Sequence, residues 1–272
     1  MDKGKFVTAQ DDRFALLMIF QNVRPWLDLH LPYLVKSNAF DGVVAVDGGS
    51  TDDGADAIRS ICKKAGFPPE SVHIVDRQFD YRFDIQTNVG IQEAEKQGYK
   101  ACLRLDTDEL MLHEHLVQIR EILLDGPYAV VRLPRYNFTK SRRYYCPQFY
   151  PDHQGRGFRL GMGLYYFGTH GVHETLWNTV NLLGLRDRQD NPHESDVITL
   201  NHANIYHYAG LASLQERHYR NYVYDCILKG EKPEPELPKA WKSQHLDYPF
   251  HIEFTGPQPL SNVHEMAPLN TK

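Results

Sequence analysis

Short apolar runs alternate with amphipathic stretches along the first half of the chain. Four runs predict strands buried on both faces, at residues 14–20, 42–46, 72–75 and 101–105. Three stretches between them have the apolar spacing of helices, at residues 24–37, 55–65 and 85–97. Strands and helices in regular alternation predict an α/β fold, with a mostly parallel central sheet and helices on both of its faces.

The second half of the chain has a less regular pattern. Strands are expected at 128–133, 163–168 and 197–207, and an amphipathic helix at 211–228. After Gly230 the composition becomes proline-rich, which predicts an extended arm or lid over residues 231–272. We expect residues 1–230 to form the main domain, with one half at 1–125 and another at 126–230.

Acidic residues cluster directly after the fourth predicted strand, at Asp106, Asp108 and Glu109. Carboxylates this close repel one another unless a cation neutralises them. Hard divalent cations such as Mg²⁺ and Mn²⁺ prefer oxygen ligands and often bridge to phosphates, so the cluster indicates a metal site. The alternative is a solvated acidic turn in which Glu109 favours the start of the next helix.

A second acidic loop, residues 47–53, follows the second predicted strand. Asp47 could accept a hydrogen bond from a ribose hydroxyl or a base N–H, and the small residues after it leave room for a nucleotide. The alternative is an ordinary loop in which Ser50, Thr51 or Asp52 caps the next helix. Because ligands of parallel sheets bind at the carboxyl ends of the strands, two acidic loops in such positions favour a ligand site.

Several segments occur in a characteristic order and spacing. In the first half they are Gln21-Asn22-Val23, Val46-Asp47-Gly48-Gly49-Ser50-Thr51-Asp52, Thr87-Asn88 and Leu105-Asp106-Thr107-Asp108-Glu109. Looser matches follow at residues 150–159, at Gly171-Val172-His173-Glu174 and at Ile205-Tyr206-His207-Tyr208. Together they resemble glycosyltransferase family 2, whose GT-A fold is Rossmann-like.

The resemblance implies a hexosyltransferase-like enzyme that moves a sugar from a nucleotide diphosphate sugar to an acceptor hydroxyl. Inversion at the anomeric carbon is expected, and retention is the alternative. The expected nucleotide-sugar contacts are Asn22, Asp47, Gly49, Ser50, Asn88, Asp106, Arg156 and Arg159. The two arginines could pair with phosphates or could equally lie in the core among aromatic side chains.

A divalent metal, Mn²⁺ or Mg²⁺, would bridge the two phosphates and stabilise the leaving diphosphate. Asp108 is expected to be its first ligand. Asp106 would bind the ribose, or the metal through water. His207 would be a third ligand because it falls in the later matching segment, with His173 as second choice.

A carboxylate must remove the proton of the attacking hydroxyl. Glu174 is the candidate base, because it follows a strand-like segment and stands next to His173. Its alternative role is a salt bridge with a nearby arginine. Asp152 is the second candidate base, and its alternative role is to cap a turn or helix after Pro151.

Composition narrows the class of protein. The chain is 42% hydrophobic and 24% charged, as in a globular protein, and its net charge of -5 argues against coating nucleic acid by bulk charge. The four cysteines show no C-x-x-C spacing and are expected to be ordinary thiols. No apolar run approaches the ~20 residues that span a bilayer, and the start of the chain lacks the apolar stretch of a signal peptide. We therefore expect a cytoplasmic protein without a transmembrane segment.

Other functions and several acceptors remain open. A nucleotidyltransferase on a related fold is one alternative, although no Gly-rich loop with Lys or Arg follows the first strand. A nucleic-acid or sugar-binding module is another, because residues 132–159 hold seven Lys or Arg and seven Phe or Tyr. The acceptor could be a saccharide, a lipid-linked saccharide, a protein or a modified nucleic acid.

Overall fold

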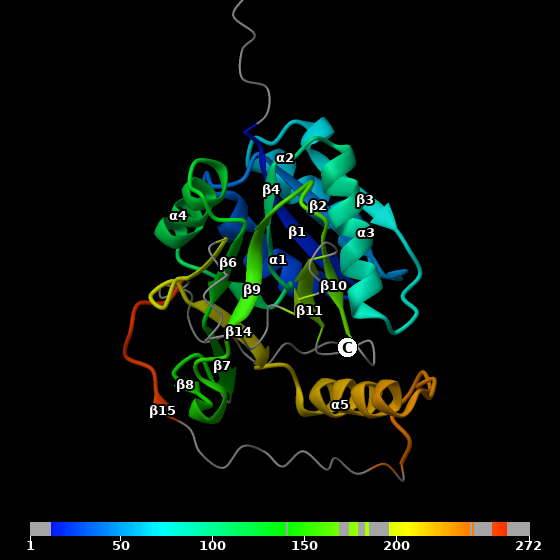
Figure 1. Ribbon diagram of the computed structural model, residues 1–272. Coiled ribbons are helices and arrows are strands. Elements are labelled where there is room, and N and C mark those ends of the chain that lie inside the picture. The colour runs from blue at the N-terminus through cyan, green and yellow to red at the C-terminus, as the bar shows by residue number, and fades with distance from the viewer. Residues whose placement is uncertain are drawn as a thin grey trace, which may run out of the picture.

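A seven-stranded sheet forms the centre of the protein, as the computed structural model shows (Figure 1). The structure describes residues 12–139, 141–168, 174–178, 183–184, 196–239, 241 and 252–259. The sheet has the order β13-β6-β9-β4-β1-β2-β3. Its strands are β1 (Phe14–Phe20), β2 (Gly42–Asp47), β3 (Val72–Asp76), β4 (Ala101–Arg104), β6 (Val130–Leu133), β9 (Gln154–Arg159) and β13 (Val197–Thr199).

Four of the six neighbouring strand pairs in this sheet are parallel. The exception is β9, which runs antiparallel to both β4 and β6. The predicted mostly parallel α/β fold is therefore confirmed. The four strands expected in the first half all form. The apolar side chains of β1, β2 and β4 are buried on both faces of the sheet, whereas β3, at its edge, is half-buried.

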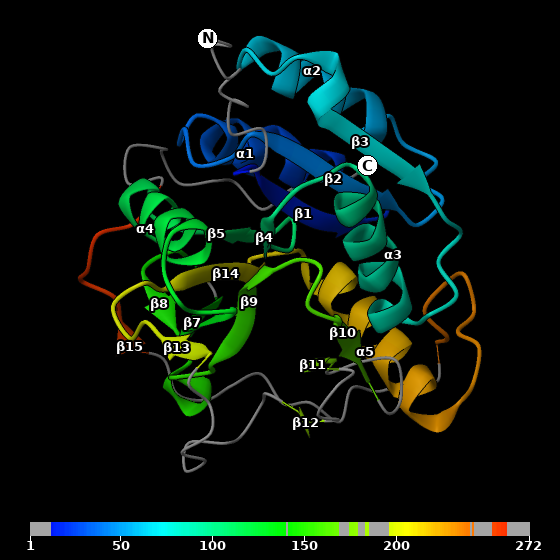
Figure 2. The same cartoon turned by 45° about the horizontal axis from the view of Figure 1, so that its top comes forward.

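Helices cover both faces of the sheet (Figure 2). They are α1 (Arg24–Val35), α2 (Gly54–Lys64), α3 (Phe83–Lys96) and α4 (His113–Leu124). Leu17 of β1 packs in one core cluster with Ile91 of α3, whereas Leu16 packs in the other with side chains of α1, α2 and α4. Helix α3 lies close to the sheet at Gly90, where a Cβ atom would stand 2.4 Å from Leu17 Cδ1.

A second sheet has the order β15-β8-β7-β14-β5. Its strands are β5 (Glu109–Leu110), β7 (Arg135–Thr139), β8 (Tyr144–Tyr145), β14 (Ile205–Gly210) and β15 (Ile252–Glu253). β7 and β14 are parallel, with Tyr206 opposite Tyr136 and His207 opposite Asn137. Because side chains alternate along a strand, the two tyrosines face one side of this sheet, and His207 and Asn137 face the other.

A three-stranded sheet completes the strand structure, with β10 (Leu164–Phe167), β11 (Thr175–Asn178) and β12 (Leu183–Gly184). Two short 3-10 helices lie at η1 (Pro69–Ser71) and η2 (Pro147–Phe149). The sequence prediction missed β7, β8 and β9, because residues 135–159 lack clear periodicity.

The predicted helix at 211–228 forms as α5 (Leu214–Lys229). A capping box between Ser213 and Glu216 begins it, and Gly230, with φ of 71°, ends it. No helix in the described part of the chain is long and apolar enough to cross a membrane.

The described residues of the proline-rich arm contact the rest of the protein. The Trp241 ring lies 5.9 Å from that of Tyr222 on α5, and the Glu234 backbone N–H donates to the Tyr222 hydroxyl at 3.0 Å. Further on, β15 pairs with β8, and Phe254 packs edge-on against Tyr136. These parts of the arm are therefore docked on the second sheet and on α5.

Candidate active site

The loops after β1 and β2 are joined by hydrogen bonds. Asn22, with φ of 52°, accepts at Oδ1 from the Thr51 backbone N–H at 2.7 Å. Its own backbone N–H donates to Ser50 Oγ at 3.0 Å. The structure thus brings together Asn22 and Ser50, two of the residues that the sequence predicts to contact the nucleotide sugar.

Asp47 organises the loop that follows it. Its Oδ1 accepts from the Gly49 and Ser50 backbone N–H groups at 3.1 and 2.8 Å, and from Ser50 Oγ at 2.6 Å. Gly49 has φ of 88°, in the left-handed region that favours glycine, and a Cβ there would stand 2.4 Å from Gln78 Oε1. The loop conformation therefore depends on Asp47 and Gly49 together. Contact of Asp47 with a base or ribose stays a prediction.

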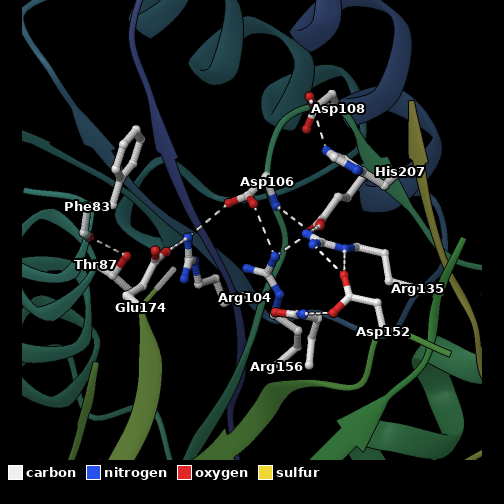
Figure 3. A network of polar contacts seen from close by, with 12 residues as sticks. Phe83, Thr87, Arg104, Asp106, Asp108, Arg135, Asp152, Arg156, Glu174 and His207 are labelled. Carbon is white, nitrogen blue, oxygen red and sulfur yellow. Dashed lines mark hydrogen bonds and ion pairs between the residues drawn. The ribbon is translucent and has the colours of Figure 1, made fainter. Parts of the chain in front are cut away.

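Asp106 is held between two arginines (Figure 3). Its Oδ1 lies 3.2 Å from Arg104 Nη2, and its Oδ2 lies 3.1 Å from Arg156 Nη2. Burial alone would raise the pKa of Asp106, but Arg156 and Arg104 outweigh burial and hold that pKa well below its usual range. Two arginines therefore neutralise this carboxylate.

Glu109 is fully buried and belongs to the same network. Its Oε1 lies 3.0 Å from Arg156 Nη2 and 3.3 Å from Arg135 Nη1, and its Oε2 accepts from the Asp106 backbone N–H at 3.0 Å. Arg135 continues the network to Asp152, with Nη2 2.6 Å from Oδ2. A buried carboxylate requires such partners, so these contacts stabilise the loop after β4.

Asp108 stands apart from the arginines and faces His207. Its Oδ2 lies 3.6 Å from His207 Nε2, and the two side chains are 19% and 21% exposed. His207 Nδ1 lies 2.7 Å from Asn137 Oδ1, to which it donates when the ring is neutral. Nε2 then presents a lone pair beside the carboxylate. Burial would raise the pKa of Asp108, but when His207 is instead protonated, its charge and hydrogen bond outweigh burial and lower that pKa.

This pair fits a divalent cation that is completed by other ligands. No group of three or more His, Cys, Asp or Glu side chains within the described ranges could hold a metal by itself. Mg²⁺ and Mn²⁺ sites commonly use one or two protein ligands, with water and substrate phosphates supplying the rest. Asp108 and His207 offer such an incomplete ligand set, whereas Asp106 is engaged by arginines.

Glu174 forms an ion pair with Arg104, the arginine that also contacts Asp106. Its Oε1 lies 2.6 Å from Arg104 Nη2, and its side chain is 12% exposed. The Arg104 guanidinium in turn lies over the ring of Tyr166. Glu174 and Asp106 are therefore joined through one shared cation, and the salt bridge expected as the alternative role of Glu174 is present.

Asp152 is engaged on both oxygens. Oδ2 accepts from Arg135 Nε at 2.9 Å, and Oδ1 accepts from Gln154 Nε2 at 2.6 Å. Burial would raise the pKa of Asp152, but Arg135 outweighs burial and lowers it. A carboxylate with a lowered pKa and full hydrogen bonding is a weak base.

The structure places two predicted nucleotide contacts in other surroundings. Asn88 exchanges two hydrogen bonds with the Tyr166 backbone, at 2.8 and 2.7 Å, which fixes α3 to β10. Arg159 pairs in register with Ala101, at the start of β4, and donates to the Leu123 carbonyl at 2.7 Å. Arg159 is thus at the opposite end of β4 from Asp106. His173 lies outside the described residues.

The basic-aromatic segment 132–159 places most of its described arginines inside the protein. Arg132 and Arg156 are buried. Arg135 and Arg159 are partly buried and make the contacts described above. Arg143 is exposed. The arginines of this segment therefore mainly form ion pairs within the site and do not form a broad basic surface for nucleic acid.

Sequence analysis missed Arg104 and Arg135, two of the three arginines that organise the site, and expected the third, Arg156, to contact the nucleotide sugar. Arg104 stands within an apolar strand, and that placement is a usable signal, because a buried arginine requires carboxylate partners. Arg135 and Asn137 gave no signal, since their partners Glu109 and His207 are distant in the sequence.

Comparisons with known proteins give matches to solved structures alone. No family model matches the chain, and no curated protein matches it. S. aureus TarS 1–349 in complex with UDP is 18% identical over 47% of this chain and 37% of that chain, with a TM-score of 0.40. Mannosyltransferase PcManGT from Pyrobaculum calidifontis, in complex with GDP-Man and Mn²⁺, is 19% identical over 46% of this chain and 37% of that chain, with a TM-score of 0.37.

A longer match is to S. aureus TarS, with 14% identity over 79% of this chain and 40% of that chain, and a TM-score of 0.47. This chain thus covers little more than a third of the length of TarS 1–349 and of PcManGT.

Proposed function

We propose that the protein is a glycosyltransferase that moves a sugar from a nucleoside diphosphate sugar to an acceptor hydroxyl. One observation carries the proposal. The loops organised by Asn22 and Asp47, and Asp108, which faces His207 of β14, all follow strands of the same parallel set, β1, β2 and β4. Carboxyl ends of parallel strands share one edge of the sheet, where open α/β sheets bind ligands.

The donor and its metal would occupy this edge. The Asp47 loop would receive the nucleoside, and Asp108 with His207 would hold Mn²⁺ or Mg²⁺. Such a metal, when bound, neutralises the charge that develops on the leaving diphosphate. Asp106 stays ionised between Arg104 and Arg156, where it can accept from a ribose hydroxyl with its partly exposed carboxylate.

Transfer requires a base for the acceptor. In an inverting displacement the acceptor oxygen forms a bond to the anomeric carbon, the bond from that carbon to the diphosphate oxygen breaks, and the hydroxyl proton goes to a carboxylate. We assign this proton to Glu174, since Asp152 is bound on both oxygens. Arg104 would orient Glu174 through their ion pair.

Thermal-shift measurements with UDP and GDP, each with and without Mn²⁺, test the proposal. Wild type should gain stability from a nucleoside diphosphate in a metal-dependent way. Asp108→Asn should lose the Mn²⁺-dependent part, whereas Asp125→Asn, a control at an exposed position after α4, should keep it. No shift in wild type with any nucleotide would refute a nucleotide-sugar enzyme.

Product analysis separates glycosyl transfer from nucleotidyl transfer. Glycosyl transfer or hydrolysis of UDP-glucose or GDP-mannose releases a nucleoside diphosphate. A nucleotidyltransferase acting in reverse would release a nucleoside triphosphate from the same compound and pyrophosphate. Formation of UTP or GTP would therefore replace the proposal by this alternative.

A further inference from the structure

A cavity of about 350 Å³ lies away from the carboxylate network. Tyr136 and Tyr206 form part of its wall, from β7 and β14, and residues of the C-terminal segment after β15 form another part. None of the residues that line it belongs to the ion-pair network around Asp106. Its volume is near the lower end of the range for small-molecule sites, about 300–1,000 Å³.

The second sheet separates this cavity from the candidate active site. Tyr206 lines the cavity, and the next residue, His207, points to the opposite side, where it faces Asp108. On β7 the same alternation places Tyr136 at the cavity and Asn137 against His207. The two sites are therefore back to back across β7 and β14.

The wall of the cavity combines aromatic rings with polar groups, one of which is acidic. The rings are those of Tyr136, Tyr145, Tyr206 and Phe254, and the polar side chains are His115, His202, Asn204, Glu253 and Thr255. Lys and Arg do not occur among the described residues that line it, and Glu253 is acidic. A phosphate or other anion would meet no cation there and one carboxylate, so the lining disfavours nucleotides.

His115 lines this wall with a partly buried ring. Its Nδ1 is buried and has no partner among the described residues. Burial lowers the pKa of His115, so the ring is neutral and can donate or accept one hydrogen bond. Because Nδ1 is enclosed by protein, a ligand in the cavity would meet the accessible part of the ring and not this atom.

We propose that the cavity binds a neutral saccharide of one or two rings, at a site separate from the proposed transfer centre. The apolar face of a sugar ring would pack on Tyr145 and Phe254, which are both partly exposed. Its hydroxyl groups would bond with His202, Asn204 and Glu253, which line the cavity. The site requires neither donor nor metal, so it stands independently of the proposed function.

Saturation-transfer NMR on the full chain, without nucleotide or metal, tests this site. The probes are the neutral disaccharides cellobiose, maltose and lactose, with glucose 6-phosphate as an anionic comparison. At least one neutral disaccharide should bind, and glucose 6-phosphate should bind more weakly. If none of the neutral saccharides binds, or if the phosphorylated sugar binds best, the assignment is wrong.

Neighbouring tyrosines on β8 provide a matched pair of variants. Tyr145→Ala should weaken binding by about 3- to 10-fold, as expected for loss of one aromatic contact, and Tyr145→Phe should retain it. Tyr144→Ala is the control, because Tyr144 is 38% exposed and does not line the cavity. Equal affinity in Tyr145→Ala and Tyr144→Ala would overturn the proposal.

Two further variants keep the test decisive. Should Tyr145→Ala fail to fold, His202→Ala replaces it, because His202 is exposed at the rim and its loss leaves the core intact. Asp108→Asn should bind the saccharide as wild type does. Loss of saccharide binding in Asp108→Asn would place the sugar at the transfer centre and contradict a separate site.

Discussion

The imidazole of His30 donates a hydrogen bond to the carbonyl oxygen of Thr107, with 2.8 Å between Nδ1 and O. His30 is 1% exposed on α1, and Thr107 stands between Asp106 and Asp108. Because a carbonyl only accepts, Nδ1 must carry the proton. Helix α1 thereby fixes the backbone from which both aspartates project.

His30 should make stability depend on pH. Burial lowers the pKa of His30 to about 4, against the opposing effects of Thr107 and Asp108 and with a smaller contribution from Arg142. Between pH 6.5 and 4 the unfolded chain takes up a proton at His30 that the native state does not. Stability is therefore fully present above pH 6.5 and falls toward pH 4, by an amount on the order of 3 kcal/mol.

Urea unfolding of metal-free wild type and His30→Gln at pH 7, 5.5 and 4.5 measures this contribution. The difference in unfolding free energy between them should shrink as the pH falls. His153→Gln is the control, because His153 bonds Asn201 in an exposed position, and its curve should follow wild type. Parallel curves for wild type and His30→Gln would show that His30 is not buried as described.

Arg156→Leu should destabilise the protein by ~3–5 kcal/mol, because it removes the cation between Asp106 and the fully buried Glu109. Urea unfolding at pH 7 is the measurement. Adding Glu109→Gln should recover part of the loss, since the double variant leaves no buried charge at that position. Arg143→Leu, at an exposed position, should stay within ~0.5 kcal/mol of wild type.

Glu174→Gln should reduce donor turnover by ~10²–10⁴-fold, the usual cost of losing a general base. It keeps the size of the side chain, so nucleotide binding should survive in the thermal-shift assay. Asp152→Asn should reduce turnover less, because Arg135 and Gln154 already occupy its oxygens. Release of nucleoside diphosphate measures both. If Asp152→Asn is inactive and Glu174→Gln is active, Asp152 and not Glu174 is the general base.

Asp47→Ala should raise the donor KM more than it lowers kcat, because a contact with the base or ribose would be similar in the ground state and the transition state. Asp47→Asn should have a smaller effect, since its amide oxygen can still accept from Gly49 and Ser50. Asp76→Ala, at the exposed end of the neighbouring strand β3, is the control for charge alone. A large loss of kcat with unchanged KM would contradict a binding role for the loop.

The sequence allowed the first half of the fold to be predicted, because buried parallel strands appear as apolar runs. It also placed Asp47 and Asp108 correctly at strand ends. It could not show that β9 enters the sheet, since residues 154–159 carry arginine and glycine at alternating positions. Gly157 fits closely there, because a Cβ would stand 3.1 Å from side chains of α4, which would have to shift slightly.

The partners of the clustered carboxylates likewise could not be predicted from the sequence. Because Asp106, Asp108 and Glu109 are close in the sequence, they predict a neutralising cation, and the expected cation is a metal ion. Arginines from three separate strands neutralise Asp106 and Glu109 instead, through contacts between residues up to 50 positions apart. Asp108 alone of the three faces a histidine, which no local pattern indicates.

The position of β9 bears on how the chain folds during synthesis. β9 lies between β4 and β6 although the ribosome makes it after both. Until residues 154–159 emerge, the growing chain carries β4 with one side unpaired, and an unpaired strand can recruit another chain. A ribosome stalled anywhere between β4 and β9 would therefore present an aggregation-prone product, because residues 1–125 alone leave one edge of β4 open.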